Sequence, residues 1–261
     1  MTTESDYFEM NRVAWDERAD VHVASRFYDV DGFLSGNSSL TEIELAELPD
    51  VSGLTLLHLQ CHFGLDTLSW ARMGARCTGV DISAVAIEHA NRLRDQTNLA
   101  ADFVCSNVYD FDRGSRAPFD IVYTSFGTIC WLPDLTRWAE VIAANLATGG
   151  TFYMAEFHPI YDLLSGYSYF TPEQPDVETE GTYTENGSEA IAEMATWAHA
   201  MSSVVNALVN AGIEVLQLNE YDFSPYNCFD GLKEKQPGRF YLDHRGHNVP
   251  LVFSLLGRKN S

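Results

Sequence analysis

Short apolar strands alternate with helices through the middle of this 261-residue chain, and this alternation limits the possible folds more than any other feature. Brief apolar runs predict strands over residues 54–59, 77–81, 101–106, 119–125 and 150–157. Helical spacing of apolar residues predicts helices over 65–74, from Ser83 with a buried stripe that reaches Leu93, and over about 135–146. Such alternation is typical of a parallel sheet with helices on both faces.

The two ends of the chain depart from this pattern. Residues 5–48 show helical and loop character without strand alternation. Residues 160–190 are rich in Pro, Gly, Thr and acids and contain the turn signal Asn186-Gly187, so we expect a lid or β-hairpin insertion there. Beyond it, the sequence predicts a helix at about 193–211, a strand over 212–218, a long aromatic loop and a last strand over 249–257. The expected organisation is a helical cap over 1–50 and a main domain over 51–261 that carries the lid.

Charge and composition exclude several classes of function. A formal net charge of −21 would repel phosphate backbones and anionic membranes, which argues against nucleic-acid and membrane partners. The same charge either keeps the protein soluble or favours cationic substrates. The sequence contains no signal peptide and no apolar run long enough to span a membrane. Five cysteines without a CxxC pair indicate reduced thiols, so we expect a cytoplasmic protein.

Ligands of open parallel sheets bind beyond the carboxyl ends of the strands, which singles out the loops after Leu59, Asp81, Ser106 and Ser125. In the first of these loops, Gly64 permits close approach of the backbone to a ligand. Asp81 follows seventeen residues later, where a carboxylate can accept hydrogen bonds from both hydroxyls of a ribose. Alternatively, Asp81 only caps the helix that starts near Ser83.

The third and fourth loops carry groups suited to a nucleoside and a second ligand. The Asn107 amide can pair with the edge of an adenine, and Val108 can lie on the face of that ring. In the fourth loop, Phe126 and Trp131 offer apolar walls, although core packing explains Trp131 equally well.

Together, these residues resemble the class I S-adenosylmethionine-dependent methyltransferases. LLHLQCHFGLDTLSWARMGARCTGVDIS is similar to the first two motifs of that family, CSNVYDF to the third and FDIVYTSFGTICWLPDL to the fourth. The usual first motif has an acid followed by three glycines at alternate positions. Here His58 stands for the acid, Gln60 and His62 replace two glycines, and Gly64 remains. The side chains at 60 and 62 therefore either point away from the cofactor or contact it directly.

The resemblance implies an α/β, Rossmann-like, seven-stranded and mostly parallel sheet with helices on both faces, whose last strand is antiparallel. It also implies S-adenosylmethionine as the cofactor, S-adenosylhomocysteine as its product, and no metal. The implied cofactor contacts are Trp15, His22, Gln60, Cys61, His62, Gly64, Asp81, Ile82, Ser83, Asn107, Val108, Ser125 and Phe126. Within this set, the loop from Gln60 to Gly64 holds the methionine half and Asp81 holds the ribose. Trp15 and His22 either contact the cofactor or pack in the core.

Methyl transfer requires alignment of the acceptor with the methyl group and exclusion of water, and a base helps some acceptors. The strand ending in EFHP places Glu156 and His158 at the expected substrate side, and His158 is either a catalytic base or a structural histidine. The aromatic side chains expected to bind a small-molecule substrate, either a flat ring or a methyl-bearing cation, are Tyr28, Trp131, Tyr169 and Trp197.

The sequence leaves open three alternatives to methyltransferase activity. A nicotinamide-dependent oxidoreductase needs GxGxxG, of which only Gly64 is present in the loop. A metal-dependent hydrolase would rest on His244 and His247 in DHRGH, without HExxH or an acid cluster. A non-enzymatic binding or scaffold protein is supported only by the altered first motif, and it would show no affinity for the cofactor.

Overall fold

The computed structural model of the chain describes residues 3–48 and 50–260. Its centre is a seven-stranded sheet in the order β3-β2-β1-β4-β5-β13-β8. These strands are β1 (Thr55–Leu59), β2 (Arg76–Asp81), β3 (Ala101–Cys105), β4 (Phe119–Thr124), β5 (Leu146–Phe157), β8 (Ile213–Tyr221) and β13 (Val252–Lys259). The first five pair in parallel, whereas β13 is antiparallel to both β5 and β8. This Rossmann-like topology confirms the expected fold.

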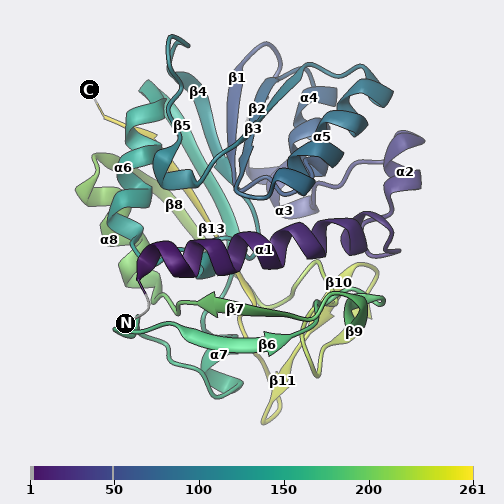
Figure 1. Cartoon of the computed structure of the whole chain (residues 1–261). Helices are drawn as coiled ribbons and strands as arrows, with labels where there is room; N and C mark the ends of the chain where they lie inside the picture. The colour runs from purple at the N-terminus through teal and green to yellow at the C-terminus, as the bar shows by residue number, and fades with distance from the viewer. Residues whose placement is uncertain (1–2, 49, 261) are drawn as a thin grey trace.

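Helices cover both faces of the sheet (Figure 1). They are α4 (Leu65–Arg72), α5 (Ala84–Thr97), α6 (Leu135–Asn145) and α8 (Met201–Asn210). Successive residues of a strand point to opposite faces, so Leu57 packs in the cluster that contains Trp138 of α6, while Leu56 packs in the cluster that contains Trp70 of α4. Burial on both faces explains why the central strands β1 and β4 are largely apolar rather than alternating, whereas the edge strand β3 is only partly buried.

The N-terminal segment forms α1 (Glu4–Val23), α2 (Val30–Leu34) and α3 (Glu42–Glu47). Thr3 and Asp6 form a capping box that starts α1. In Figure 1, α1 lies between the sheet with its helices and the β6–β7 pair, and it contacts both α5 and β7. The predicted helical character of residues 5–48 is confirmed.

Residues 160–196, here called the lid, contain α7 (Ile160–Leu164) and the antiparallel strands β6 (Asp176–Glu180) and β7 (Ala192–Thr196). An antiparallel strand pair is therefore present, but its second strand lies beyond the expected bounds of 160–190. The predicted helix at about 193–211 is wrong in its first part, because α8 begins only at Met201. Pairing with β6 fixes residues 192–196 as a strand. The amide of Asn11 in α1 also exchanges two hydrogen bonds with the backbone of Ala195 (2.8 and 2.9 Å), which holds β7 extended.

The remaining elements are short. The predicted long loop before the last strand contains two small hairpins, formed by β9 (Lys233–Gln236) with β10 (Arg239–Tyr241) and by β11 (Asp243–His244) with β12 (His247–Asn248). Single 3₁₀ turns occur at Val108–Asp110, Ile129–Trp131 and Gly187–Glu189. In residues 3–48 and 50–260, no helix is long and apolar enough to cross a membrane.

Candidate functional site

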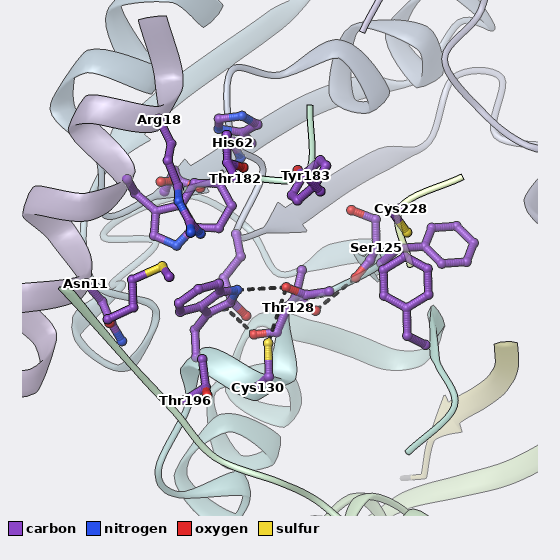
Figure 2. Close-up of a pocket in the computed structure, with 18 of the residues that line it drawn as sticks. Asn11, Arg18, His62, Ser125, Thr128, Cys130, Thr182, Tyr183, Thr196 and Cys228 are labelled. Atoms are coloured by element: carbon purple, nitrogen blue, oxygen red, sulfur yellow. Dashed lines mark hydrogen bonds between the residues drawn. The ribbon is translucent and has the colours of Figure 1, made fainter. Parts of the chain in front are cut away.

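A cavity of about 1330 Å³ lies at the carboxyl ends of β1, β2, β3 and β4, and it is covered by α1 and the lid. Figure 2 shows how Arg18 of α1, His62 of the loop after β1, and Thr182 and Tyr183 of the lid gather around it. Of the residues predicted to bind the cofactor or the substrate, those that line the cavity are Trp15, Tyr28, Gln60, Cys61, His62, Gly64, Asp81, Ile82, Asn107, Val108, Ser125, Phe126 and Trp131. The loops after four parallel strands therefore meet at one place, as the sheet topology requires.

The loop after β1 has the backbone shape of a glycine-rich turn although it contains one glycine. Gln60, His62 and Gly64 have φ angles of 57°, 51° and 82°, all in the left-handed region. A Cβ atom at Gly64 would lie 2.6 Å from the Phe103 ring, which explains why this glycine remains. Side chains other than glycine are strained in this conformation, by about 1–2 kcal/mol each. Positions 60 and 62 therefore carry side chains where the fold would accept glycine more easily.

The side chains at these two strained positions are half-buried and only partly hydrogen-bonded. Gln60 donates from Nε2 to the Thr128 carbonyl (2.9 Å), whereas its Oε1 is buried without a hydrogen-bond partner. His62 Nε2 shares a hydrogen bond with His22 Nδ1 (2.8 Å), and His62 Nδ1 is buried without a partner. His22 Nε2 is in turn 2.7 Å from the Thr182 hydroxyl.

Both imidazoles are neutral at ordinary pH. Burial, together with the charge of Arg18, lowers the pKa of His22 to about 3, and burial lowers the pKa of His62 well below its usual value. His22 does not line the cavity itself; it acts through His62, whose ring it orients. We therefore expect the pair to donate and accept hydrogen bonds rather than to carry charge.

Arg18 also lines the cavity, and the sequence analysis did not single it out. Its side chain is 4% exposed, and its guanidinium lies 5.5 Å from the Trp15 ring and 5.8 Å from the Trp131 ring. Nη2 donates to the Gly181 carbonyl (2.7 Å), but Nε has no partner. The spacing from Trp15 to Arg18 to His22 puts all three on one face of α1, which is the signal that could have revealed it.

The loop after β2 presents Asp81 to the cavity. Its carboxylate accepts hydrogen bonds from the backbone N–H groups of His62 (2.7 Å) and Ser83 (2.9 Å), and burial raises its pKa to about 6. Ser83 does not line the cavity: its hydroxyl caps α5 and donates to Asp16 (2.7 Å). The expected contact from the Ser83 side chain is therefore not supported, while Asp81 remains available to a ligand.

The adenine-side residues lie next to Asp81. Ile82 and Val108 line the cavity with Asn107, whose Oδ1 accepts from the backbone N–H of Tyr109 (3.0 Å). That contact fixes the Asn107 amide and leaves its NH₂ group free to donate to a ring nitrogen.

The loop after β4 is held from behind by two buried groups. Glu156 accepts hydrogen bonds from the backbone N–H groups of Gly127, Thr128 and Ile129, and it does not line the cavity. His58 contacts the Ser125 hydroxyl through Nε2 (3.1 Å) and the Thr67 hydroxyl through Nδ1 (2.8 Å). Glu156 is thus a positioning residue for this loop rather than a catalytic residue.

The structure does not bring His158 to the cavity. Its Nδ1 accepts from the backbone N–H of Ile160 (3.1 Å), so Nε2 carries the proton and donates to Glu220 (3.0 Å). Both ring nitrogens are therefore in use, and the structural alternative for His158 is the one that fits. Tyr169 and Trp197 also do not line the cavity; Trp197 is buried and packs edge-on against Tyr7.

Aromatic residues other than the four expected to bind the substrate also line the cavity: Phe157, Tyr161, Tyr167, Tyr183, Tyr226 and Phe229. They come from the end of β5, the lid and the loop after β8, and only the folded chain brings them together. His244 and His247, considered as metal ligands, lie exposed on the β11–β12 hairpin. Within the described part of the chain, no three His, Cys, Asp or Glu side chains are grouped so that they could hold a metal ion.

Comparison with known proteins agrees with this geometry. Residues 57–152 match a family model described as a methyltransferase domain. A ubiquinone biosynthesis O-methyltransferase of Xanthomonas euvesicatoria is 24% identical over 211 residues, which cover 78% of this chain and 82% of that protein.

Two solved structures share the fold at low identity. An S-adenosylmethionine-dependent methyltransferase from Mesorhizobium loti has a TM-score of 0.58 at 18% identity, over 87% of this chain and all of that one. The DhpI–SAH complex has a TM-score of 0.61 at 15% identity, over 99% of each chain. The matched residues 57–152 include the loops after β1, β2 and β4 that line the cavity. Residues 57–152 therefore match a methyltransferase domain, and the chain shares its fold with S-adenosylmethionine-dependent methyltransferases.

Proposed function

We propose that this methyltransferase acts on a small molecule, which binds beside the cofactor in the same covered cavity. The observation that carries the proposal is the size of that cavity, about 1330 Å³. Pockets for single drug-sized ligands usually measure about 300–1000 Å³, so this one has room for a cofactor and a small acceptor together. The Xanthomonas relative, a ubiquinone biosynthesis O-methyltransferase, also favours a small-molecule acceptor.

The residues at one end of the cavity fit the nucleoside half of S-adenosylmethionine. The Asp81 carboxylate can accept from the ribose hydroxyls, because each of its oxygens keeps a lone pair beyond the backbone contacts. Ile82 and Val108 offer apolar surface to the adenine, and the Asn107 NH₂ can donate to it. The methionine half would then lie toward the loop from Gln60 to Gly64.

The cofactor, when bound, supplies a methyl group already activated on a sulfonium. The chain then has to position the acceptor and exclude water. The lid is held over the cavity by the hydroxyl pair of Tyr183 with Tyr28, which lies between α1 and α2, and by the amide contact of Asn11 in α1 with Ala195. Glu156 fixes the loop after β4. Because His158 is turned away, we propose alignment rather than a histidine base as the main source of rate.

The opposite end of the cavity suggests the class of acceptor. Its walls include the aromatic rings of Phe157, Tyr161 and Phe229, and Tyr161 stacks on Phe229 with 4.2 Å between ring centroids. Glu178 and Asp230 also line the cavity. Flat aromatic walls favour a ring, and the carboxylates disfavour an anion at that end. We therefore propose a ring-bearing acceptor that is neutral or cationic.

The test is formation of S-adenosylhomocysteine and of a methylated product with a panel of phenols, amines and carboxylic acids. We expect turnover with a phenol or an aromatic amine. Phe229→Ala should raise the acceptor KM about tenfold, because it removes a ring from the wall, while the Kd of S-adenosylhomocysteine stays unchanged. The matched control is Phe170→Ala, whose ring is 70% exposed and does not line the cavity. An unchanged KM, or turnover restricted to a protein or nucleic-acid acceptor, would contradict the proposal.

A further inference from the structure

We infer that the side chains of Arg18, Gln60 and His62 form a binding site for an α-amino-acid group, namely the methionine end of the cofactor. The inference rests on the proposed function, because it assigns part of the same cavity. It goes further by giving side chains of this chain a task that a glycine loop would leave to the backbone.

The first observation is that three buried polar atoms of the cavity lining lack a hydrogen-bond partner: Arg18 Nε, Gln60 Oε1 and His62 Nδ1. Buried polar groups are almost always paired, so unpaired ones that line a cavity point to a ligand that completes them. The three residues share neighbours. Arg18 and His62 both lie against Trp15, and Gln60 binds the carbonyl of Thr128, which also accepts from the backbone N–H of Trp131.

The second observation is the charge of Arg18. Within residues 3–48 and 50–260, Arg18 has no carboxylate at ion-pair distance, and it is the one Lys or Arg that lines the cavity. A buried guanidinium without an anion is unfavourable, so a ligand that brings a carboxylate would stabilise this part of the structure. In a chain of net charge −21, such a cation is not part of a general anion-binding surface.

The third observation is the hydrogen-bond direction along the histidine pair. If the Thr182 hydroxyl donates to His22 Nε2, then His22 Nδ1–H donates to His62 Nε2, and His62 Nδ1 carries its own proton. His62 and Arg18 then both present donors to a carboxylate. Gln60 presents an acceptor to an ammonium group. This set of two donors and one acceptor complements an α-amino acid.

This binding site also accounts for the strained backbone at positions 60 and 62. Glycine would relieve the left-handed conformation at both positions, yet the chain has Gln and His there. Strain that persists at a cavity is expected where the side chain contributes to binding.

The experiment compares S-adenosylhomocysteine, which has the amino-acid end, with 5′-methylthioadenosine, which lacks it. Calorimetric titration of the parent chain should give a Kd at least tenfold lower for S-adenosylhomocysteine. Arg18→Met should weaken S-adenosylhomocysteine at least tenfold and leave 5′-methylthioadenosine within about threefold, because only the first ligand has a carboxylate to lose a charged partner. Binding of 5′-methylthioadenosine also shows that the variant is folded.

Arg116→Met is the matched control, since Arg116 is exposed and does not line the cavity; it should change neither Kd. Gln60→Leu should weaken S-adenosylhomocysteine in the same selective way. The inference would be overturned if the parent chain bound both ligands with equal Kd. It would also be overturned if Arg18→Met left the Kd of S-adenosylhomocysteine unchanged and instead raised the KM of an amino-acid acceptor. Failure of both ligands to bind the parent chain would instead contradict the proposed function itself.

Discussion

Gln60 shows how a single residue sets the shape of the cofactor loop. Its φ of 57° lies in the left-handed region, where a Cβ atom is costly. We therefore predict that Gln60→Ala unfolds with a free energy about 1 kcal/mol lower than Gln60→Gly, since only the glycine is free of that strain. Both variants lose the contact with Thr128, so their difference isolates the backbone conformation. Urea unfolding of the two variants measures it.

The control for that pair is the exposed Gln96 in α5, where the helical backbone reverses the order. There the alanine variant should be the more stable one, by about 0.5–1 kcal/mol. If alanine is also favoured at position 60, the left-handed turn described for this loop does not exist.

Asp81 links the same loop to pH. Burial raises the pKa of its carboxyl to about 6, and the ionised form is the better acceptor for ribose hydroxyls. Affinity for S-adenosylhomocysteine should therefore rise as the pH increases through about 6 and then level off. Asp81→Ala should bind more than tenfold more weakly and lose this rise. Calorimetry between pH 5 and pH 8 tests both; a similar rise in the variant would assign the titration to another group.

At the scale of elements, α3 is tied to the sheet through a buried carboxyl. Glu44 is bonded to the Tyr123 hydroxyl of β4 and accepts from the backbone N–H of Thr41 (2.8 Å). Burial, with a contribution from the nearby Asp66, raises the pKa of Glu44 to about 8. Because this pKa exceeds the value of about 4.3 in the unfolded chain, folding favours the protonated form.

The stabilisation from Glu44 should thus be complete below pH of about 4.3 and disappear as the pH rises through about 8. Glu44→Gln mimics the protonated carboxyl and does not titrate. We predict that the free energy of unfolding falls more steeply between pH 5 and pH 8 in the parent chain than in Glu44→Gln. Urea unfolding at each pH measures this difference, and parallel curves would refute it.

The elements also differ in how far the sequence predicts them. The central strands β1 and β4 were predictable because burial on both faces makes each a largely apolar run, as in Phe119–Thr124. The strand Ala192–Thr196 was not predictable from the sequence. Its extended conformation depends on pairing with β6 and on the amide of Asn11, which is far away in sequence.

The residues of the candidate site also differ in how far the sequence predicts them. Asp81 and Asn107 were predictable because they follow strands whose ends must meet. Arg18 shares one face of α1 with Trp15 and His22, but its lack of an anionic partner becomes visible only when α1 is packed over the cavity. His158 was expected at the substrate side from its position after β5, but the contact with Glu220 turns its ring away. Strand position predicts which loops meet, while side-chain direction depends on tertiary contacts.

At the scale of the whole molecule, α1 and the lid form one cover. Asn186 Nδ2 donates to the Val21 carbonyl (2.9 Å), and Arg18 and Asn11 bind lid backbone as well. A ligand beneath this cover should stabilise it against local opening. We predict that S-adenosylhomocysteine slows hydrogen exchange in residues 4–23 and 181–196, and leaves the β9–β10 and β11–β12 hairpins unchanged. Protection confined to the sheet loops would mean that the cover does not close over the cofactor.

The most direct test of the whole account is calorimetric titration of the chain with S-adenosylhomocysteine, with NADH as the control ligand. A cavity formed by Asp81, Asn107 and the loop from Gln60 to Gly64 predicts a Kd of about micromolar for S-adenosylhomocysteine, or about −8 kcal/mol, and no binding of NADH. No detectable binding of S-adenosylhomocysteine would mean that the side chains of Gln60 and His62 fill the cofactor site. A binding or scaffold role would then replace catalysis.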